Sequence, residues 1–280
     1  MAQRPVWSHG CVGAFESELK NVAVQVAGEA ASLVRQAREA MLTGRPVRVD
    51  TKSTDTDVVT AVDRASERLV RERLAELRPG EHVLGEEEGG SAGDGVTWVV
   101  DPIDGTVNFL YGSPVFSVSL AAQVDGVSLA GVVVEPVDGR VWTAVRGEGA
   151  WLDGRRLGTS SPERLELTLV ATGFAYAAER RERQARAVAD LLGRVRDIRR
   201  PGSASLDLCA VAAGWTDAYI EHGLKRWDWA AGALIAAEAG AVVSLPGEDE
   251  ELGVDATFAA APSIAEPLHA ALVECGFKGA

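Results

Sequence analysis

The chain has 280 residues, of which 46% are apolar, and it carries a formal net charge of −13. This length is ample for a sizeable core in one large domain or in two fused halves. The negative charge argues against a surface built for nucleic acid or for an anionic membrane, because both need a positive field. An anionic substrate would need a local cation to receive it, so the acidic balance favours a bound metal.

The three cysteines, Cys11, Cys209 and Cys275, are odd in number and far apart. They predict neither a disulfide framework nor a thiolate metal site, and they favour a reducing compartment. Residues 1–20 lack the apolar core of a signal peptide, and no apolar run approaches the ~18 residues of a membrane span. We therefore expect a cytoplasmic protein. Residues 1–15 are a candidate disordered terminus, followed by one domain over 16–280 with halves at 16–153 and 154–280.

Two helices are predicted at the start of the domain. Apolar residues recur at helical spacing over 18–43, and Gly44, Arg45 and Pro46 end that helix. A second helix is predicted over 61–77, with Thr60 as N-cap and Asp63 three residues later.

Short β runs follow these helices. Strands are predicted at 83–84, 96–100, 115–124, 127–134 and 141–145. Asp125 and Gly126 join two of them, which is a strong hairpin signal. The pattern indicates a meander, so at least part of this sheet is antiparallel.

The second half alternates between the two kinds of element. Strands are expected at 167–172, 195–198, 217–221, 241–244 and 257–260, and helices at 177–192, 203–213, 227–239 and 264–275. No repeat or long linker separates the halves, so they should pack closely. The predicted class is mixed α/β, with layered sheets and helices.

The strongest chemical motif is the segment 98–109, Trp-Val-Val-Asp-Pro-Ile-Asp-Gly-Thr-Val-Asn-Phe. An apolar strand delivers Asp101 at its end, and Pro102 is expected to stop the strand ladder there. Asp104 follows three residues later, and Gly105 frees the backbone to turn. Two carboxylates beside a helix start can hold a hard cation next to a phosphate. Taken alone, however, the motif is more typical of an ordinary capping turn.

Three further acids stand in suggestive positions, but each has an ordinary structural explanation. Glu86 lies in an acidic run that would usually be solvated surface. Asp228 opens an Ala-rich helix, where an acid complements the helix dipole. Asp63 can be a simple cap. Only their combined order and spacing favour a site.

That combination resembles the inositol monophosphatase family of lithium-sensitive, Mg²⁺-dependent phosphatases, and is closest to its actinobacterial inositol-1-monophosphatases. Four blocks carry the resemblance, in the family's order: 52–63, 85–87, 98–109 and 227–232. It implies a layered αβαβα sandwich with mixed, largely antiparallel sheets. It also implies hydrolysis of inositol 1-phosphate to myo-inositol and phosphate by water attack, with two to three Mg²⁺ per site.

The resemblance implies roles for individual residues, which are expectations at this stage. The first metal would be held by Glu86, Asp101 and the carbonyl of Ile103, and a second by Asp101, Asp104 and Asp228. A third, weaker ion would lie near Glu86 and Asp63. Thr60, Asp63 and Thr106 would orient or deprotonate the attacking water, and Gly105 and Thr106 would donate to the phosphate. Substrate contacts would also come from Asp104 and Asp228, from Lys52 on a mobile flap, from Glu221 and from Ala204 packing nearby.

Several alternatives stay open. The same chemistry could act on histidinol phosphate, fructose 1,6-bisphosphate or 3′-phosphoadenosine 5′-phosphate, although no aromatic platform for a nucleotide is evident. Glu221 favours a hydroxyl-rich substrate, because a carboxylate can accept from two vicinal hydroxyls. A regulatory role at RNA polymerase is a second class of function. A metal-binding module without catalysis would predict loss of Thr106 or Asp63, and both are present.

Three charges near the expected site have no assigned role. Glu88 leaves the ligand register of its loop uncertain, and Lys225 and Arg226 could bind a second phosphate, steer substrate or simply be solvated. Family resemblance also implies a homodimer.

Overall fold

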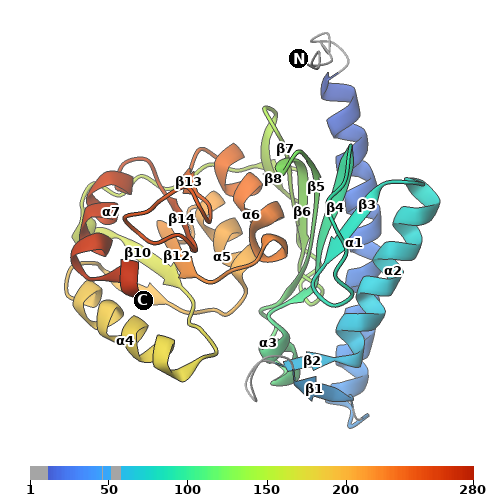
Figure 1. Ribbon diagram of the computed structural model, residues 1–280, viewed down its shortest axis with the longest axis horizontal. Helices are drawn as coiled ribbons and strands as arrows, with labels where there is room; N and C mark the ends of the chain where they lie inside the picture. The colour runs from blue at the N-terminus through green and yellow to red at the C-terminus, as the bar shows by residue number, and fades with distance from the viewer. Residues whose placement is uncertain (1–11, 46, 52–57) are drawn as a thin grey trace.

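The computed structural model describes residues 12–45, 47–51 and 58–280, and it stacks helices and sheets in alternating layers (Figure 1). Helices α1 and α2 cover the outer face of a seven-stranded sheet, and α5 and α6 fill the space between this sheet and a five-stranded one. Helices α4 and α7 cover the far side of the second sheet. The predicted αβαβα sandwich is therefore confirmed. No helix in the described ranges is long and apolar enough to cross a bilayer.

The outer helices of the first half are α1 (Val12–Leu42) and α2 (Ala61–Leu77). The stretch 12–15 is thus helical rather than disordered, and residues 1–11 lie outside the described ranges. The buried face of α1 is rich in alanine, including Ala23, Ala27 and Ala30. Because these side chains are small, the backbone of α1 can lie close to the sheet and pack against it without voids.

The seven-stranded sheet has the order β3-β4-β5-β6-β7-β8-β9, and only β3 and β4 run parallel. Its strands are β3 (His82–Gly85), β4 (Val96–Asp104), β5 (Ser117–Val124), β6 (Val127–Val134), β7 (Val141–Val145), β8 (Gly149–Leu152) and β9 (Arg155–Arg156). The hairpin at Asp125-Gly126 is confirmed, with both residues at positive φ. Strands β8 and β9 were not predicted. Asp153-Gly154, also at positive φ, is the turn signal that sequence reasoning missed.

Strand β4 does not stop at Pro102 as predicted. It continues to Asp104 through a register shift, because Asp101 pairs with Ser119 whereas Asp104 pairs with Ser117. The extra residue forms a bulge, where a proline without an N–H costs the ladder no hydrogen bond. This bulge turns the end of the strand toward the second half of the molecule.

The middle layer consists of α5 (Ala204–Ala212) and α6 (Arg226–Glu238). Alanine, leucine and isoleucine cover α6 on all sides, which is typical of a helix buried between two sheets. A short helix, α3 (Thr106–Leu110), directly follows β4.

The second sheet has the order β11-β10-β12-β14-β13 and is mixed, with the first three strands parallel. Its strands are β10 (Leu169–Thr172), β11 (Asp197–Arg199), β12 (Ala218–His222), β13 (Val242–Ser244) and β14 (Ala256–Ala260). The outer helices are α4 (Ala178–Leu192) and α7 (Ala265–Glu274), with single 3₁₀ turns at Leu165–Leu167 and Phe277–Gly279. A small separate hairpin pairs β1 (Val49–Thr51) with β2 (Val58–Thr60).

Candidate active site

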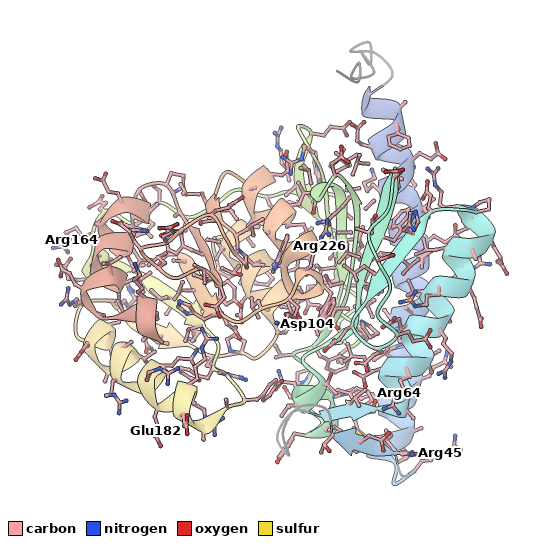
Figure 2. The ribbon with its side chains drawn as sticks, viewed as in Figure 1. Arg45, Arg64, Asp104, Arg164, Glu182 and Arg226 are labelled. Carbon is pink, nitrogen blue, oxygen red and sulfur yellow. The ribbon has the colours of Figure 1, made fainter. Side chains whose placement is uncertain are left out.

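A polar cavity of about 140 Å³ opens between the two halves of the molecule. Figure 2 shows Asp104 at this junction, between the seven-stranded sheet and the middle helices. Residues from both halves line the cavity: Glu86, Asp101, Ile103, Gly105, Thr106, Phe174, Tyr176, Arg200, Gly202, Ala204, Glu221, Leu224 and Asp228. Blocks 85–87, 98–109 and 227–232, predicted from separate stretches of sequence, thus meet in one place.

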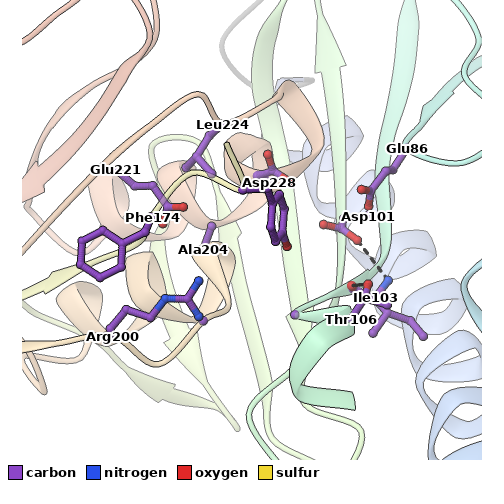
Figure 3. Close-up of a pocket in the computed structure, with 13 residues that line it drawn as sticks. Glu86, Asp101, Ile103, Thr106, Phe174, Arg200, Ala204, Glu221, Leu224 and Asp228 are labelled. Carbon is purple, nitrogen blue, oxygen red and sulfur yellow. Dashed lines mark hydrogen bonds between the residues drawn. The ribbon is translucent and has the colours of Figure 1, made fainter. Parts of the chain in front are cut away.

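Three carboxylates converge on one end of the cavity (Figure 3). Asp101 comes from β4, Glu86 from the loop after β3, and Asp228 from the first turn of α6. Asp101 is only 2% exposed, and the backbone N–H of Ile103 donates to its Oδ1 at 3.0 Å. Burial raises the pKa of Asp101 well above its usual value, and the charge of Glu86 raises it further. Carboxylates crowded in this way hold protons unless a cation compensates them.

Asp228 is oriented by the start of its own helix. The backbone N–H of Lys225 donates to its Oδ2 at 2.5 Å, and this bond fixes the carboxylate in the first turn. Burial, followed by repulsion from Glu86, raises its pKa well above the ordinary range. Asp228 therefore caps its helix through one oxygen and also lines the cavity, and its role as a metal ligand stays a prediction.

Asp104 has a different environment from the other acids of its motif. Its Oδ2 accepts from the Ser203 hydroxyl at 2.7 Å, and from the Ser205 backbone N–H at 2.7 Å and hydroxyl at 2.5 Å. Its Oδ1 accepts only from the Ala204 N–H, at 3.1 Å. Asp104 thus fastens the end of β4 to the first turn of α5. A metal contact, which the sequence also predicts for it, would have to use Oδ1.

The donor set suits a hard divalent cation. It consists of oxygen alone, from the carboxylates of Glu86, Asp101 and Asp228 and the carbonyl of Ile103, all of which line the cavity. Within the described ranges, no three acidic, histidine or cysteine side chains already form a compact ligand cluster. Mutual repulsion of buried like charges explains that spacing, and a cation would relieve it.

The hydroxyl of Thr106 connects the cavity to a buried acid. Thr106 Oγ1 lies 2.9 Å from Asp63 Oδ1 and 3.0 Å from the Ile103 carbonyl. The other oxygen of Asp63 accepts from the Thr60 backbone N–H at 2.9 Å and from its hydroxyl. Neither Thr60 nor Asp63 lines the cavity, and both are fully buried. Any effect of these two residues on a bound water must therefore pass through Thr106.

Gly105 makes the sharp turn between β4 and α3. Its φ is +100°, and a Cβ there would lie 3.1 Å from the Gly202 carbonyl and 3.2 Å from that of Val115. Only glycine fits both the backbone conformation and the space. The turn leaves the backbone of Gly105 and Thr106 against the cavity.

Glu221 lines the opposite side of the cavity. It lies on β12, and the hydroxyl of Tyr219 donates to its Oε2 at 2.7 Å. Burial raises the pKa of Glu221 to about 7, although the bond from Tyr219 acts in the other direction. Ala204 lies nearby at the start of α5, where its side chain limits the depth of the cavity.

The sequence matches a known protein family over most of its length. The model of the inositol monophosphatase family matches residues 16–276. The chain belongs to this family.

Individual members of the family resemble the chain over most of its length. An inositol-1-monophosphatase of Mycobacterium leprae is 53% identical over 272 residues, with 91% of this chain and 93% of that protein covered. The structure of Mycobacterium tuberculosis SuhB matches with a TM-score of 0.79 at 45% identity, covering 93% of this chain and 97% of that one. A Nus factor SuhB of Escherichia coli (strain K12) is 39% identical over 227 residues, covering 80% and 84% of the two chains. Family membership confirms that the chain is a phosphatase.

Not every charged residue considered in the sequence analysis lines the cavity. Lys52 lies outside the described residues, directly after β1. Glu88 forms an ion pair with Arg71 at 3.5 Å and does not line the cavity, whereas Glu86 does. Arg226 donates to Gln123 at 2.5 Å, so its guanidinium is engaged at the sheet and not at the cavity.

Sequence reasoning missed one wall of the cavity. Phe174, Tyr176 and Arg200 line it, and the sequence had not made an aromatic platform evident. Figure 3 shows Phe174 and Arg200 beside Glu221, across the cavity from Asp101. Both aromatic residues follow β10 directly, at the carboxyl edge of the parallel strands, and that position was the available signal.

Proposed function

We propose that the chain is a Mg²⁺-dependent phosphomonoesterase that hydrolyses inositol 1-phosphate to myo-inositol and phosphate. The observation that carries the proposal is that the two ends of the cavity differ. Carboxylates that could bind a metal lie at one end, and Glu221, which could accept hydrogen bonds from substrate hydroxyls, lies at the other. A cavity of about 140 Å³ suits a small polyol phosphate. The Mycobacterium leprae relative is named an inositol-1-monophosphatase, which supports the same substrate.

Glu86, Asp101, Asp228 and the Ile103 carbonyl would hold the cations, and Asp104 would contribute through Oδ1. When bound, Mg²⁺ lowers the pKa of a coordinated water and stabilises the oxygen that leaves the phosphorus. The number of ions, two to three, and lithium sensitivity are parts of the proposal that rest on family resemblance.

The chain's own groups would then orient the attacking water. Thr106 donates to Asp63 Oδ1 or to the Ile103 carbonyl, so its oxygen is free to accept a hydrogen bond from a water in the cavity. The raised pKa of buried Asp63, which desolvation causes, makes this carboxylate a better proton acceptor than a surface aspartate. A proton could therefore move from the water through the Thr106 hydroxyl to Asp63.

The remaining contacts would position the substrate. Gly105 and Thr106 line the cavity, and their backbone N–H groups would donate to phosphate oxygens. Glu221 would accept from hydroxyls of the polyol, with Ala204 packing against the ring. Lys52, for which the resemblance implies a contact to the phosphate, lies outside the described residues. We also propose a homodimer in the cytoplasm, on the basis of resemblance and composition.

The cavity wall formed by Phe174, Tyr176 and Arg200, which the sequence analysis did not predict, favours a second candidate class of substrate. Phe174 and Tyr176 offer aromatic surface, and Arg200 adds a cation. Such a wall suits a larger phosphomonoester with a second anionic group or a base, such as 3′-phosphoadenosine 5′-phosphate or fructose 1,6-bisphosphate. A regulatory role is the second class of function, and the name of the Escherichia coli relative supports testing it.

The test is phosphate release from a panel of these substrates and histidinol phosphate, with and without Mg²⁺. We expect Mg²⁺-dependent turnover of inositol 1-phosphate that is inhibited by Li⁺ and lost in Asp101→Asn. Preference for another member would replace the substrate and keep the chemistry. If no substrate is turned over at any Mg²⁺ concentration, the catalytic proposal is wrong, and pull-down with RNA polymerase becomes the decisive measurement.

A further inference from the structure

The carboxylate of Glu221 accepts a hydrogen bond from a fully buried tyrosine on its own strand. Tyr219 precedes it by two residues on β12, so both side chains project from the same face of the sheet. The Tyr219 hydroxyl donates to Glu221 Oε2 at 2.7 Å. Because the ring is enclosed on all sides, it cannot follow the carboxylate if the carboxylate moves, and the bond therefore fixes the position of Oε2.

A glycine on the neighbouring strand end provides the space for the same carboxylate. A Cβ at Gly173 would lie 1.8 Å from Glu221 Oε2, 2.1 Å from Cδ and 2.2 Å from Oε1. The φ of Gly173 lies outside the left-handed range, so its backbone conformation does not call for glycine. The reason for glycine here is contact: the carboxylate lies flat against the bare backbone at this position.

The surrounding charges leave one oxygen for the cavity. Asp207 on α5 and Asp104 repel Glu221 on its protein side, whereas Arg200 attracts it from the cavity wall. Oε2 is engaged by Tyr219, and Oε1 has no hydrogen-bond partner within the described parts of the chain. Oε1 is thus the acceptor that Glu221 presents to a ligand.

We propose that Tyr219 and Gly173 are positioning residues that set the selectivity of this site for phosphomonoesters with hydroxyl groups next to the ester. They do so by holding Glu221 with Oε1 turned to the cavity, and neither residue touches the substrate. This inference rests on the proposed function. The proposed function gives Glu221 the contact with the substrate, and this inference adds the two residues that hold the Glu221 carboxylate in place.

The first test is Tyr219→Phe, which removes the hydroxyl and keeps the ring. The measurement is kcat and KM for inositol 1-phosphate and for phenyl phosphate, which has no hydroxyl for Glu221 to accept. We expect KM for inositol 1-phosphate to rise about 10-fold, since a hydrogen bond to a charged group is lost, with kcat nearly unchanged. Phenyl phosphate should be hydrolysed as by the wild type. Tyr111→Phe is the matched control, because Tyr111 is 88% exposed.

The second test is Gly173→Ala, which forces the carboxylate out of its place. The same selectivity should fall about 10-fold or more. Gly28→Ala is the matched control, since a Cβ at Gly28 meets nothing within 4 Å. In a Glu221→Gln background Tyr219→Phe should have little further effect, because the two changes break one interaction. Thermal unfolding of each variant separates selectivity from loss of folding, and if Gly173→Ala does not fold, Tyr219→Phe still decides.

The outcomes separate this inference from the proposed function. A wild type that does not hydrolyse inositol 1-phosphate would overturn both the proposed function and this inference. A wild type that hydrolyses inositol 1-phosphate and phenyl phosphate equally well would overturn the inference alone, because no hydroxyl is then recognised. A selective wild type whose Tyr219→Phe and Gly173→Ala variants keep that selectivity, or lose activity on both substrates equally, would overturn the inference alone.

Discussion

At the scale of single residues, the Thr106 hydroxyl stands between the cavity and an acid that the cavity does not reach. Thr106 lines the cavity, and its hydroxyl lies 2.9 Å from Asp63 Oδ1 and 3.0 Å from the Ile103 carbonyl. General-base assistance of this kind is worth about 10²–10⁴ in rate. A side chain of the same shape without the hydroxyl should therefore impair turnover much more than binding.

We predict that Thr106→Val lowers kcat about 100-fold or more and changes KM little, whereas Thr106→Ser keeps most of the activity. Steady-state kinetics on inositol 1-phosphate with saturating Mg²⁺ provides the measurement. Comparable kcat in Thr106→Val and Thr106→Ser would show that the hydroxyl does not carry the proton.

Asp207 is a second residue whose environment predicts a measurable effect. It is 2% exposed, its Oδ2 has no hydrogen-bond partner among the residues that the structure describes, and burial raises the pKa of this carboxyl well above its usual value. Below the unfolded pKa of about 3.9 the group is protonated in both states and costs nothing. As pH rises from this value through the higher folded pKa, the free energy of unfolding falls. The unfolded chain releases the proton freely, whereas the folded state must either keep it or bury a charge.

We predict that Asp207→Asn stabilises the protein by about 1–3 kcal/mol at pH 8 and by nearly nothing at pH 4. Thermal unfolding across this pH range measures the difference. Asp94→Asn, at an exposed loop position, is the control. A difference between variant and wild type that does not grow with pH would contradict this account of Asp207.

At the scale of the elements, helix α2 shows that a cap can serve a site. Thr60 and Asp63 form a complete capping box at its N-terminus, and the sequence predicted this cap correctly. The same bonds hold Asp63 toward Thr106. The cap therefore also sets the direction of the Asp63 carboxylate toward Thr106, and the proposed role of Asp63 depends on this helix start.

We predict that Thr60→Ala destabilises the protein by about 1 kcal/mol and also lowers kcat, because Asp63 loses the hydroxyl that fixes it. Thr60→Ser restores both properties, since its hydroxyl can cap in the same way. Chemical denaturation and kinetics on the same samples provide the two readouts. Loss of stability with wild-type kcat would mean that the cap and the acid are independent.

Most elements were predictable because their signals are local. The helix over 61–77 and the strands at 127–134 and 141–145 have the predicted bounds, since caps, turns and periodicity lie within each segment. The bulge at Pro102 was not predictable, because it depends on the partner strand β5. Of the site, the acids of the recognisable blocks were found. Phe174, Tyr219 and Asp207 were not, because their significance comes from which strand or helix lies beside them.

At the scale of the whole molecule, the site is shared between halves that contact each other through the middle helices. Glu86 and Asp101 belong to the first half, and Asp228 and Glu221 to the second. A cation bound by both halves would bind the folded state and not the unfolded chain, so it should add to stability.

We predict that Mg²⁺ at about 100 times its dissociation constant raises the free energy of unfolding by about 2.7 kcal/mol, or Tm by roughly 5–10 °C. EDTA should reverse the change, and Asp101→Asn should lack it. Asp94→Asn should respond as the wild type does. An equal shift in Asp101→Asn would place the bound ion elsewhere on the molecule.

The order of the shared residues along the chain has a consequence for synthesis on the ribosome. Glu86, Asp101 and Thr106 emerge long before Glu221 and Asp228, and the hydroxyl and amide groups that fasten Asp104 emerge between them, at 203–205. A nascent chain that has completed only the seven-stranded sheet holds half a cavity and half a ligand set. Under the proposed function, hydrolysis can therefore begin only on a chain whose second half, with Glu221 and Asp228, has been translated and has packed against the first.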